Sequence, residues 1–168
     1  MKNNRYYWIA GIILLDQIVK LIVRCSMYIG QSIPVIKDIF HITYVQNRGA
    51  AFNMLDGKSL VLILVPAIAI AIGVWYMEKH LEEHWILLVS LVLVIAGGIG
   101  NLIDRCFMGF VTDMFDFRIW PVFNIADIAV CVGAGLLILY TFAFYEEKEI
   151  EEEINNWIDF CTKTVHVL

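Results

Sequence analysis

Three long uncharged stretches constrain this chain more than any other feature of its sequence. Residues 60–77, 85–103 and 128–145 contain no Asp, Glu, Lys or Arg. A helix needs about 20 apolar residues to cross a bilayer, with a range of about 17–25, so each stretch predicts a membrane-spanning helix. Only 17% of the residues are charged, whereas soluble domains carry about a quarter. The sequence therefore predicts an all-α, multi-pass membrane protein.

A fourth apolar stretch, residues 6–23, is interrupted by Asp16 and Lys20. These two residues share one face of a helix because they lie four positions apart. A paired acid and base can be tolerated in a membrane where it faces other helices. Lys2 and Arg5 precede the stretch as in a signal peptide, but no small-residue cleavage site follows it, so we expect it to be retained. The chain should therefore cross the bilayer four times.

The segments outside the expected helices differ in character. In the long connection after the first expected helix, residues 24–59, a β-branched run at residues 39–45 predicts a short strand or hairpin on the membrane surface. After residue 145 the chain becomes acidic and places apolar residues at helical spacing. We therefore expect a four-span domain over residues 1–145 and an acidic, amphipathic tail over residues 146–168.

The polar residues that are hardest to place in apolar sequence converge on one membrane face. Polar groups at membrane depth are energetically expensive and are functional candidates by default. Four crossings bring the following residues to the same side: Asp16, Lys20, Asn47, Arg48, Asn101, Asp104, Arg105, Asp113, Asp116, Asn124 and Asp127. Gly97, Gly98 and Gly100 precede the polar end of the third helix, where they should let a neighbouring backbone or a substrate approach closely.

Carboxylates in such a place have a defined chemistry. Two of them cannot both ionise easily at low dielectric, so one stays protonated while the other acts as a base. Such a pair activates water against an amide without a metal ion or a nucleophilic side chain. No serine lies in a GxSxG turn, and a Ser–Lys dyad using Lys20 has no evident serine partner. The histidines form no HExxH pattern and the four cysteines are widely spaced, so neither a zinc site nor a disulfide framework is expected.

Spacing alone leaves several roles open. Asp113 and Asp116 both fall in the expected loop after the third helix, where a carboxylate is usually just solvated. Asp127 has the stronger case, because it interrupts an apolar stretch and reaches water only if the site is wet. Asp16 and Lys20 are better explained as a structural pair than as reacting groups. The remaining polar residues also have structural alternatives, as a turn, an interhelical hydrogen bond or an anchor at the lipid headgroups: Asn47, Arg48, Asn101 and Arg105.

Five blocks of the chain resemble, in the same order, the motifs of lipoprotein signal peptidase (signal peptidase II). The resemblance extends from the first helix to about Tyr145. It rests on these blocks: Asp16-Gln17-Ile18-Val19-Lys20; Asn47-Arg48-Gly49-Ala50-Ala51-Phe52; Gly97-Gly98-Ile99-Gly100-Asn101-Leu102-Ile103-Asp104-Arg105; Val111-Thr112-Asp113; and Phe123-Asn124-Ile125-Ala126-Asp127. The chain departs from the family at Met114, where phenylalanine is commoner, and we interpret this as a tolerated apolar exchange.

The resemblance implies an aspartyl endopeptidase whose catalytic residues fall on Asp113 and Asp127, with no metal ion and no cofactor. Other residues of the matching blocks would support the site or bind substrate: Asp16, Lys20, Asn47, Arg48, Gly98, Asn101, Arg105 and Asn124. The implied substrate is a prolipoprotein with a diacylglyceryl group on the cysteine that follows its signal peptide, cut before that cysteine. We expect a monomer among the lipids of a bacterial inner or cytoplasmic membrane, with its site on the extracytoplasmic side. The tail beyond Tyr145 is not part of the family pattern, and the four crossings predict that it lies in the cytoplasm.

Two other classes of function compete with this interpretation. A small proton-coupled transporter could use Asp16, Lys20 and Asp127 as a relay, but a relay should place ionisable groups at successive depths, and these cluster near one face. A non-catalytic scaffold would not need two convergent aspartates. No cluster of basic residues indicates a nucleic-acid partner.

Overall fold

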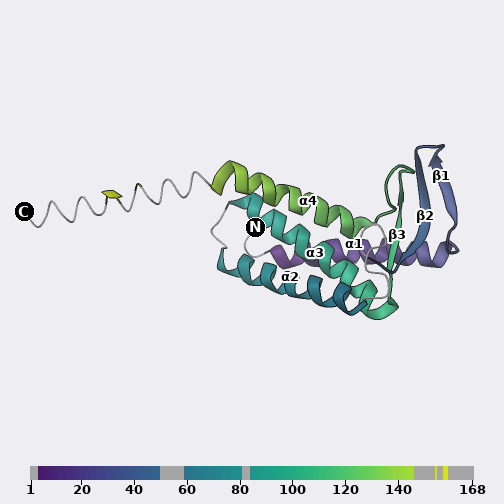
Figure 1. Cartoon of the computed structure of the whole chain (residues 1–168), viewed down its shortest axis with the longest axis horizontal. Coiled ribbons are helices and arrows are strands. Elements are labelled where there is room, and N and C mark those ends of the chain that lie inside the picture. The colour runs from purple at the N-terminus through teal and green to yellow at the C-terminus, as the bar shows by residue number, and fades with distance from the viewer. Residues whose placement is uncertain (1–3, 50–58, 81–83, 146–153, 155–156, 159–168) are drawn as a thin grey trace, which may run out of the picture.

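The computed structural model describes residues 4–49, 59–80, 84–145, 154 and 157–158. Four long helices lie alongside one another, and a small sheet lies at one end of the bundle (Figure 1). The helices are α1 (Arg5–Ser26), α2 (Ser59–Lys79), α3 (Trp85–Met108) and α4 (Ile125–Tyr140), and a π-helical turn, η2 (Thr141–Tyr145), continues α4. The mostly helical architecture confirms the predicted class. The predicted tail lies almost wholly outside the described residues.

Three of the described helices are long and apolar enough to cross a membrane. They comprise Leu60–Lys79, Trp85–Met108 and Ile125–Ala143, in agreement with the three uncharged stretches of the sequence. Helix α1 forms where residues 6–23 predicted a helix, but it does not belong to this set. The fold therefore confirms three of the four predicted spans by length and composition.

Helix α3 is the centre of the bundle, because it packs against each of the other three helices. Its close contacts depend on glycine. A Cβ atom on Gly97 would lie 2.3 Å from the backbone oxygen of Ala126 in α4, and one on Gly100 would lie 2.8 Å from Asp16 Oδ2 in α1. The prediction that these glycines admit a neighbouring backbone is confirmed at Gly97, and Gly100 admits a buried carboxylate.

The sheet has three antiparallel strands in the order β1 (Ser32–Ile36), β2 (Phe40–Asn47) and β3 (Val111–Asp116). Strand β2 confirms the strand predicted near residues 39–45. The placement of β3 corrects the sequence interpretation, which put Asp113 and Asp116 in a solvated loop. The two aspartates lie in a strand, and both are buried. Strand β3 is buried along almost its whole length, so it lacks the alternation of polar and apolar residues that marks a half-exposed strand.

Candidate active site

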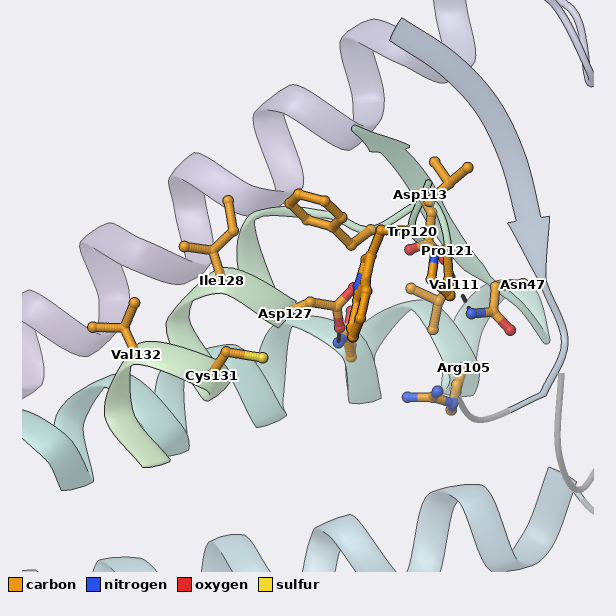
Figure 2. Close-up of a pocket in the computed structure, with 13 residues that line it drawn as sticks. Asn47, Arg105, Val111, Asp113, Trp120, Pro121, Asp127, Ile128, Cys131 and Val132 are labelled. Carbon is orange, nitrogen blue, oxygen red and sulfur yellow. Dashed lines mark hydrogen bonds between the residues drawn. The ribbon is translucent and has the colours of Figure 1, made fainter. Parts of the chain in front are cut away.

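Asp113 and Asp127 line one cavity of about 450 Å³ at the sheet end of the bundle. Figure 2 shows them reaching it from different elements, Asp113 from β3 and Asp127 from the first turn of α4. Most of the cavity wall is apolar and comes from the segment before α4, from α4 itself and from the start of β3: Trp120, Pro121, Val122, Phe123, Ile128, Val132 and Val111. The two carboxylates therefore share a space with little polar surface around them.

The carboxylate of Asp113 is held by two neutral amides. Asn47 Nδ2 donates to Asp113 Oδ2 at 3.0 Å, and Asn124 Nδ2 donates to Oδ1 at 2.6 Å. The strand register brings Asn47 close, because Asn47 pairs with Val111 and Val45 pairs with Asp113. No cation is in direct contact with this carboxylate among the described residues. Burial, and then the charge of Asp127, raise the pKa of Asp113 to about 7.

Asp127 is fixed by the way in which α4 begins. Asn124 is the N-cap, and its side chain accepts a hydrogen bond from Asp127 N at 2.9 Å. In return, Asp127 Oδ2 accepts from Asn124 N at 3.1 Å, which completes a capping box. The other carboxylate oxygen, Oδ1, accepts from Asn101 Nδ2 at 2.7 Å. The sequence placed Asn124 and Asp127 on one side of the membrane, and the capping box joins them directly.

Two asparagine amides connect the carboxylates. Asn124 Nδ2 donates both to Asp113 and, at 3.1 Å, to Asn101 Oδ1. Because Asn101 in turn donates to Asp127, a continuous path of side-chain hydrogen bonds runs from one aspartate to the other. The structure thus brings together four of the residues predicted from sequence, and neutral donors leave the charge of the aspartate pair uncompensated at close range.

A buried ionic cluster lies behind this path. Lys20 Nζ donates to Asn101 Oδ1 at 2.9 Å and forms ion pairs with Asp16 (2.9 Å) and Asp104 (3.4 Å). Asp16 and Lys20 were predicted to support the site, but Asp104 was recognised only as a polar residue at the end of the third helix. Gln17 was not predicted either, although it is next to Asp16 on α1. Its side-chain amide donates to the carboxylates of Asp16 and Asp104.

Three other predicted residues occupy different positions. Arg105 lines the cavity and donates to Gly49 O at 3.2 Å. Arg48 is exposed and does not belong to the cavity lining within the described part of the chain. Gly98 packs against Ile70 of α2 and lines a second cavity, of about 300 Å³, that also touches Asp127.

The apolar wall from Trp120 to Phe123 was not predicted. Its aromatic and proline content was the one signal available, and nothing in the spacing connected it with a site.

The arrangement can activate a water molecule between a carboxylate and a carboxylic acid. The cavity lining includes one thiol, Cys131, one helical turn beyond Asp127 (Figure 2). Among the described residues, the same lining contributes no imidazole or amine that could activate this thiol. Within the described residues, no group of three His, Cys, Asp or Glu side chains could hold a metal ion. Two carboxylates that share one cavity can act as an acid and a base toward a bound water.

The chain is similar to known proteins over most of its length. Residues 8–143 match the family described as signal peptidase (SPase) II. The lipoprotein signal peptidase of Halothermothrix orenii is 50% identical over 135 residues, which cover 80% of this chain and 92% of that protein. The enzyme of Clostridioides difficile is 43% identical over 136 residues, which cover 80% of this chain and 90% of that protein.

A solved structure described as a bacterial membrane enzyme superposes with a TM-score of 0.81. It is 31% identical in sequence, and the match covers 87% of this chain and 92% of that one. The family match spans well over half of the chain, and the solved structure shares its fold. This chain belongs to the signal peptidase II family.

Proposed function

We propose that this chain is an aspartyl endopeptidase that removes the signal peptide from diacylglyceryl-modified prolipoproteins. The observation that carries the proposal is that Asp113 and Asp127 line one cavity and are joined by amide hydrogen bonds. Family membership supports a peptidase acting on prolipoproteins. The shared cavity and the motif blocks together support Asp113 and Asp127 as the two catalytic residues.

The proposed reaction is hydrolysis of the peptide bond before the lipid-bearing cysteine. Asp127 is ionised and takes a proton from a water molecule while the water oxygen attacks the carbonyl carbon. Asp113 is protonated and donates a hydrogen bond to the carbonyl oxygen, which becomes the oxyanion. Its raised pKa of about 7 suits this role, because a carboxyl group must hold its proton near neutral pH to act as an acid. Asp127 then gives the proton it took from water to the leaving nitrogen as the C–N bond breaks and the oxyanion reforms a carbonyl, which leaves Asp127 ionised and Asp113 protonated as at the start.

The supporting residues have distinct proposed roles in this scheme. The amides of Asn47, Asn101 and Asn124 orient the carboxylates, as their hydrogen bonds indicate. Arg105 lines the same cavity, where its guanidinium suits a polar part of the substrate. Arg48 and Gly98 lie farther from the two carboxylates, and we assign them to substrate binding at the rim and in the second cavity.

The apolar cavity walls suit a substrate that arrives from the membrane. The main cavity and the cavity between α2, α3 and α4 share four residues, so they meet at the proposed catalytic centre: Asn101, Arg105, Asp127 and Cys131. A signal peptide and acyl chains are both apolar, and burying them there removes them from water and headgroups. We assign both cavities to the substrate without distinguishing its parts.

We also propose that α1 is a fourth span, so that residues 1–145 cross a bacterial inner or cytoplasmic membrane four times. The charges of α1 support this, because Asp16 and Lys20 are buried against α3 and do not face lipid. The sheet and the site would then lie on the extracytoplasmic side, with residues 146–168 as a cytoplasmic tail and the protein acting as a monomer. Labelling of a Lys79→Cys variant in intact cells tests this orientation, since access by an impermeant reagent from outside would contradict it.

The transporter alternative has less support from the arrangement of charges. Asp16, Lys20 and Asp104 form one cluster with the cavity aspartates at the sheet end of the bundle. At the other end, Arg5 pairs with Glu78, and Tyr6 also hydrogen-bonds to Glu78. A proton path would need titratable groups between these ends, and α2 and α3 present apolar residues there.

The experiment that tests the proposal uses the purified full-length chain in detergent. It is mixed with a diacylglyceryl-modified prolipoprotein and, in parallel, with the same precursor lacking the lipid. We expect release of the signal peptide from the lipid-modified precursor alone, detected by mass spectrometry with the lipid-bearing cysteine as the new N-terminus. No release from either precursor, or equal release from both, would overturn the proposed substrate class.

A further inference from the structure

Two buried carboxylates outside the proposed reaction each hold a backbone N–H of the site. Asp16 Oδ1 accepts from Ala126 N at 2.9 Å, and Asp104 Oδ2 accepts from Thr112 N at 2.9 Å. Ala126 and Thr112 are the residues immediately before the two proposed catalytic aspartates. The first contact spans 110 positions of the chain and joins α1 to α4, whereas the second spans eight positions and joins the end of α3 to β3. Each contact therefore connects two different elements of the fold.

One cation serves both carboxylates. Lys20 Nζ lies 2.9 Å from Asp16 Oδ2 and 3.4 Å from Asp104 Oδ2, and the side chains of all three residues are at most 1% exposed. Buried charges of this kind depend on one another, because removal of one partner leaves the others without compensation. The two carboxylates are therefore fixed relative to each other through a single ammonium group.

The surroundings of Asp104 restrict it further. Its Oδ1 atom faces Gln17 Nε2 at 3.3 Å and Arg24 Nη1 at 3.4 Å, while Oδ2 faces the Thr112 amide. Arg24 also donates to Thr112 Oγ1 at 3.1 Å. Thr112 is thus held by both its backbone and its side chain, on the face of β3 opposite to the one that Asp113 presents to the cavity.

A hydrogen bond to a backbone N–H fixes the plane of that peptide, and hence where the next residue begins. The direction of the Cα–Cβ bond at that residue follows from this orientation. We propose that Asp16 and Asp104 are positioning residues, which set the separation of Asp127 and Asp113 through their shared counter-ion Lys20. The inference rests on the proposed function, since it assigns a purpose to that separation. A misplacement of about 1 Å at a reacting group costs about 10²-fold in rate.

The experiment compares Asp16→Ala and Asp104→Ala in the full-length chain in detergent. Amide NMR signals of Ala126 and Thr112 report each tether directly, without reference to activity. We expect Asp104→Ala to shift the Thr112 signal most and that of Ala126 less, through the shared Lys20, and Asp16→Ala to do the reverse. In both variants kcat should fall by about 10- to 100-fold while KM changes less than about threefold, because the substrate cavity is left intact.

The matched control is Asp116→Ala. It removes a buried carboxylate too, in this case one in β3, but the partners of Asp116 are Thr43 and Arg118, which lie outside the cluster. It should leave kcat within about threefold of the parent. A kcat loss in this control as large as that of Asp104→Ala would reduce the effect to general damage and overturn the inference. A shifted Thr112 signal with unchanged kcat in Asp104→Ala would overturn it as well.

A second variant decides the question if Asp104→Ala does not fold. Asp104→Asn keeps an oxygen that can accept from Thr112 N, so the amide signal should stay near its parent position and kcat should stay within about fivefold. A larger kcat loss with the Thr112 signal unmoved would contradict the tether. Failure of the proposed function looks different, because the parent chain would then show no cleavage while the amide signals still respond.

Discussion

Strand β3 carries two buried aspartates three residues apart, and their surroundings are opposite. Asp113 accepts hydrogen bonds from two neutral amides, and burial together with the charge of Asp127 raises its pKa to about 7. Burial also disfavours the ionised form of Asp116, but hydrogen bonds from Thr43 and Arg118 outweigh it and hold the pKa of Asp116 below its usual range. The same residue type on one strand thus has its pKa raised to about 7 in one place and lowered below its usual range in the other.

The difference teaches how a reacting carboxylate can be distinguished from a structural one. Asp116 has a cation, Arg118, at 2.9 Å, and its charge is used to hold the turn that follows β3. Asp113 faces a cavity and a second carboxylate, and its two amide donors offset only part of the cost of its ionisation. Burial is common to both residues and does not separate them; the charge and direction of the hydrogen-bond donors do.

The difference between Asp113 and Asp116 should be largest in the rate at which their variants cleave the precursor. Asp113→Asn and Asp127→Asn each remove a proton-transfer group, so we expect cleavage of the lipid-modified precursor to fall by at least about 10³-fold. The double variant should be little worse, because residues that act as a unit are strongly non-additive. Asp116→Asn should keep substantial activity. Initial cleavage rates of the four variants, each checked for folding by thermal denaturation, give the measurement.

Two outcomes would break this part of the comparison. An inactive Asp116→Asn beside an active Asp113→Asn would exchange the roles of the two strand aspartates. Activity in both Asp113→Asn and Asp127→Asn would remove the aspartyl mechanism altogether.

The sequence located this region of the molecule but could not separate its two strand aspartates. Uncharged stretches predicted three helices because their length and composition are local properties. Spacing brought Asn101, Asn124 and Asp127 to one face for the same reason. The environment of Asp113 depends on Asn47, which lies 66 positions away in the chain, and only the pairing of β2 with β3 brings the two together. Resemblance to a family selected Asp113, and the geometry supplies the physical reason.

The role of Asp104 in the buried ionic cluster was not predicted, for a related reason. It stands next to Arg105 at the end of a helix, where an exposed ion pair is the common outcome. Its partners Lys20, Arg24 and Thr112 come from α1 and β3 and are not visible in local sequence. Lys20, Arg24 and Asp16 do share one face of α1 at intervals of four residues, and that repeat was the available signal for a buried acceptor opposite them.

The second prediction concerns the sign of two stability changes. The Asp113 pKa of about 7 lies above the ordinary value of 3.8, so the folded state holds a proton that the unfolded state releases. Stability therefore falls as pH rises from about 4 to 7, by up to about 4 kcal/mol. Asp113→Asn removes this penalty. Its new NH₂ group, however, faces the NH₂ group of Asn47 or Asn124, which donates to Asp113 in the parent, so part of the gain is lost. We therefore expect the variant to be more stable at pH 8 by about 1–3 kcal/mol.

Asp116→Asn should have the opposite sign. The pKa of Asp116 is lowered, so its contribution is present above the ordinary value near 4 and is lost as pH falls through the lowered pKa. We expect a loss of about 1–2 kcal/mol at pH 8 that shrinks under acidic conditions. Thermal denaturation in detergent at pH 5 and pH 8 measures both variants, and equal signs at pH 8 would contradict the difference between the two sites.

The smallest expected effect is a shift of the alkaline limb of the pH–rate profile. The rate should fall as pH rises through about 7, because Asp113 loses the proton that it donates. The hydrogen bond from Asn47 favours the ionised form and so lowers this pKa. Asn47→Ala removes that bond, and the limb should move to higher pH. The ratio of the rate at pH 8 to that at pH 6 should rise by about two- to fivefold, since one pKa unit corresponds to a factor of ten.

The neighbouring residue provides the control for this shift. Gln46 precedes Asn47 on β2, but its amide donates to Tyr44 Oη and not to the cavity. Gln46→Ala should therefore leave the alkaline limb where it is, even if it slows the reaction slightly. A limb that moves to lower pH in Asn47→Ala would mean that the group titrating near pH 7 gains its proton affinity from Asn47. Asp113 would then not be the acid, because an amide N–H donor can only stabilise the charged form of a carboxylate.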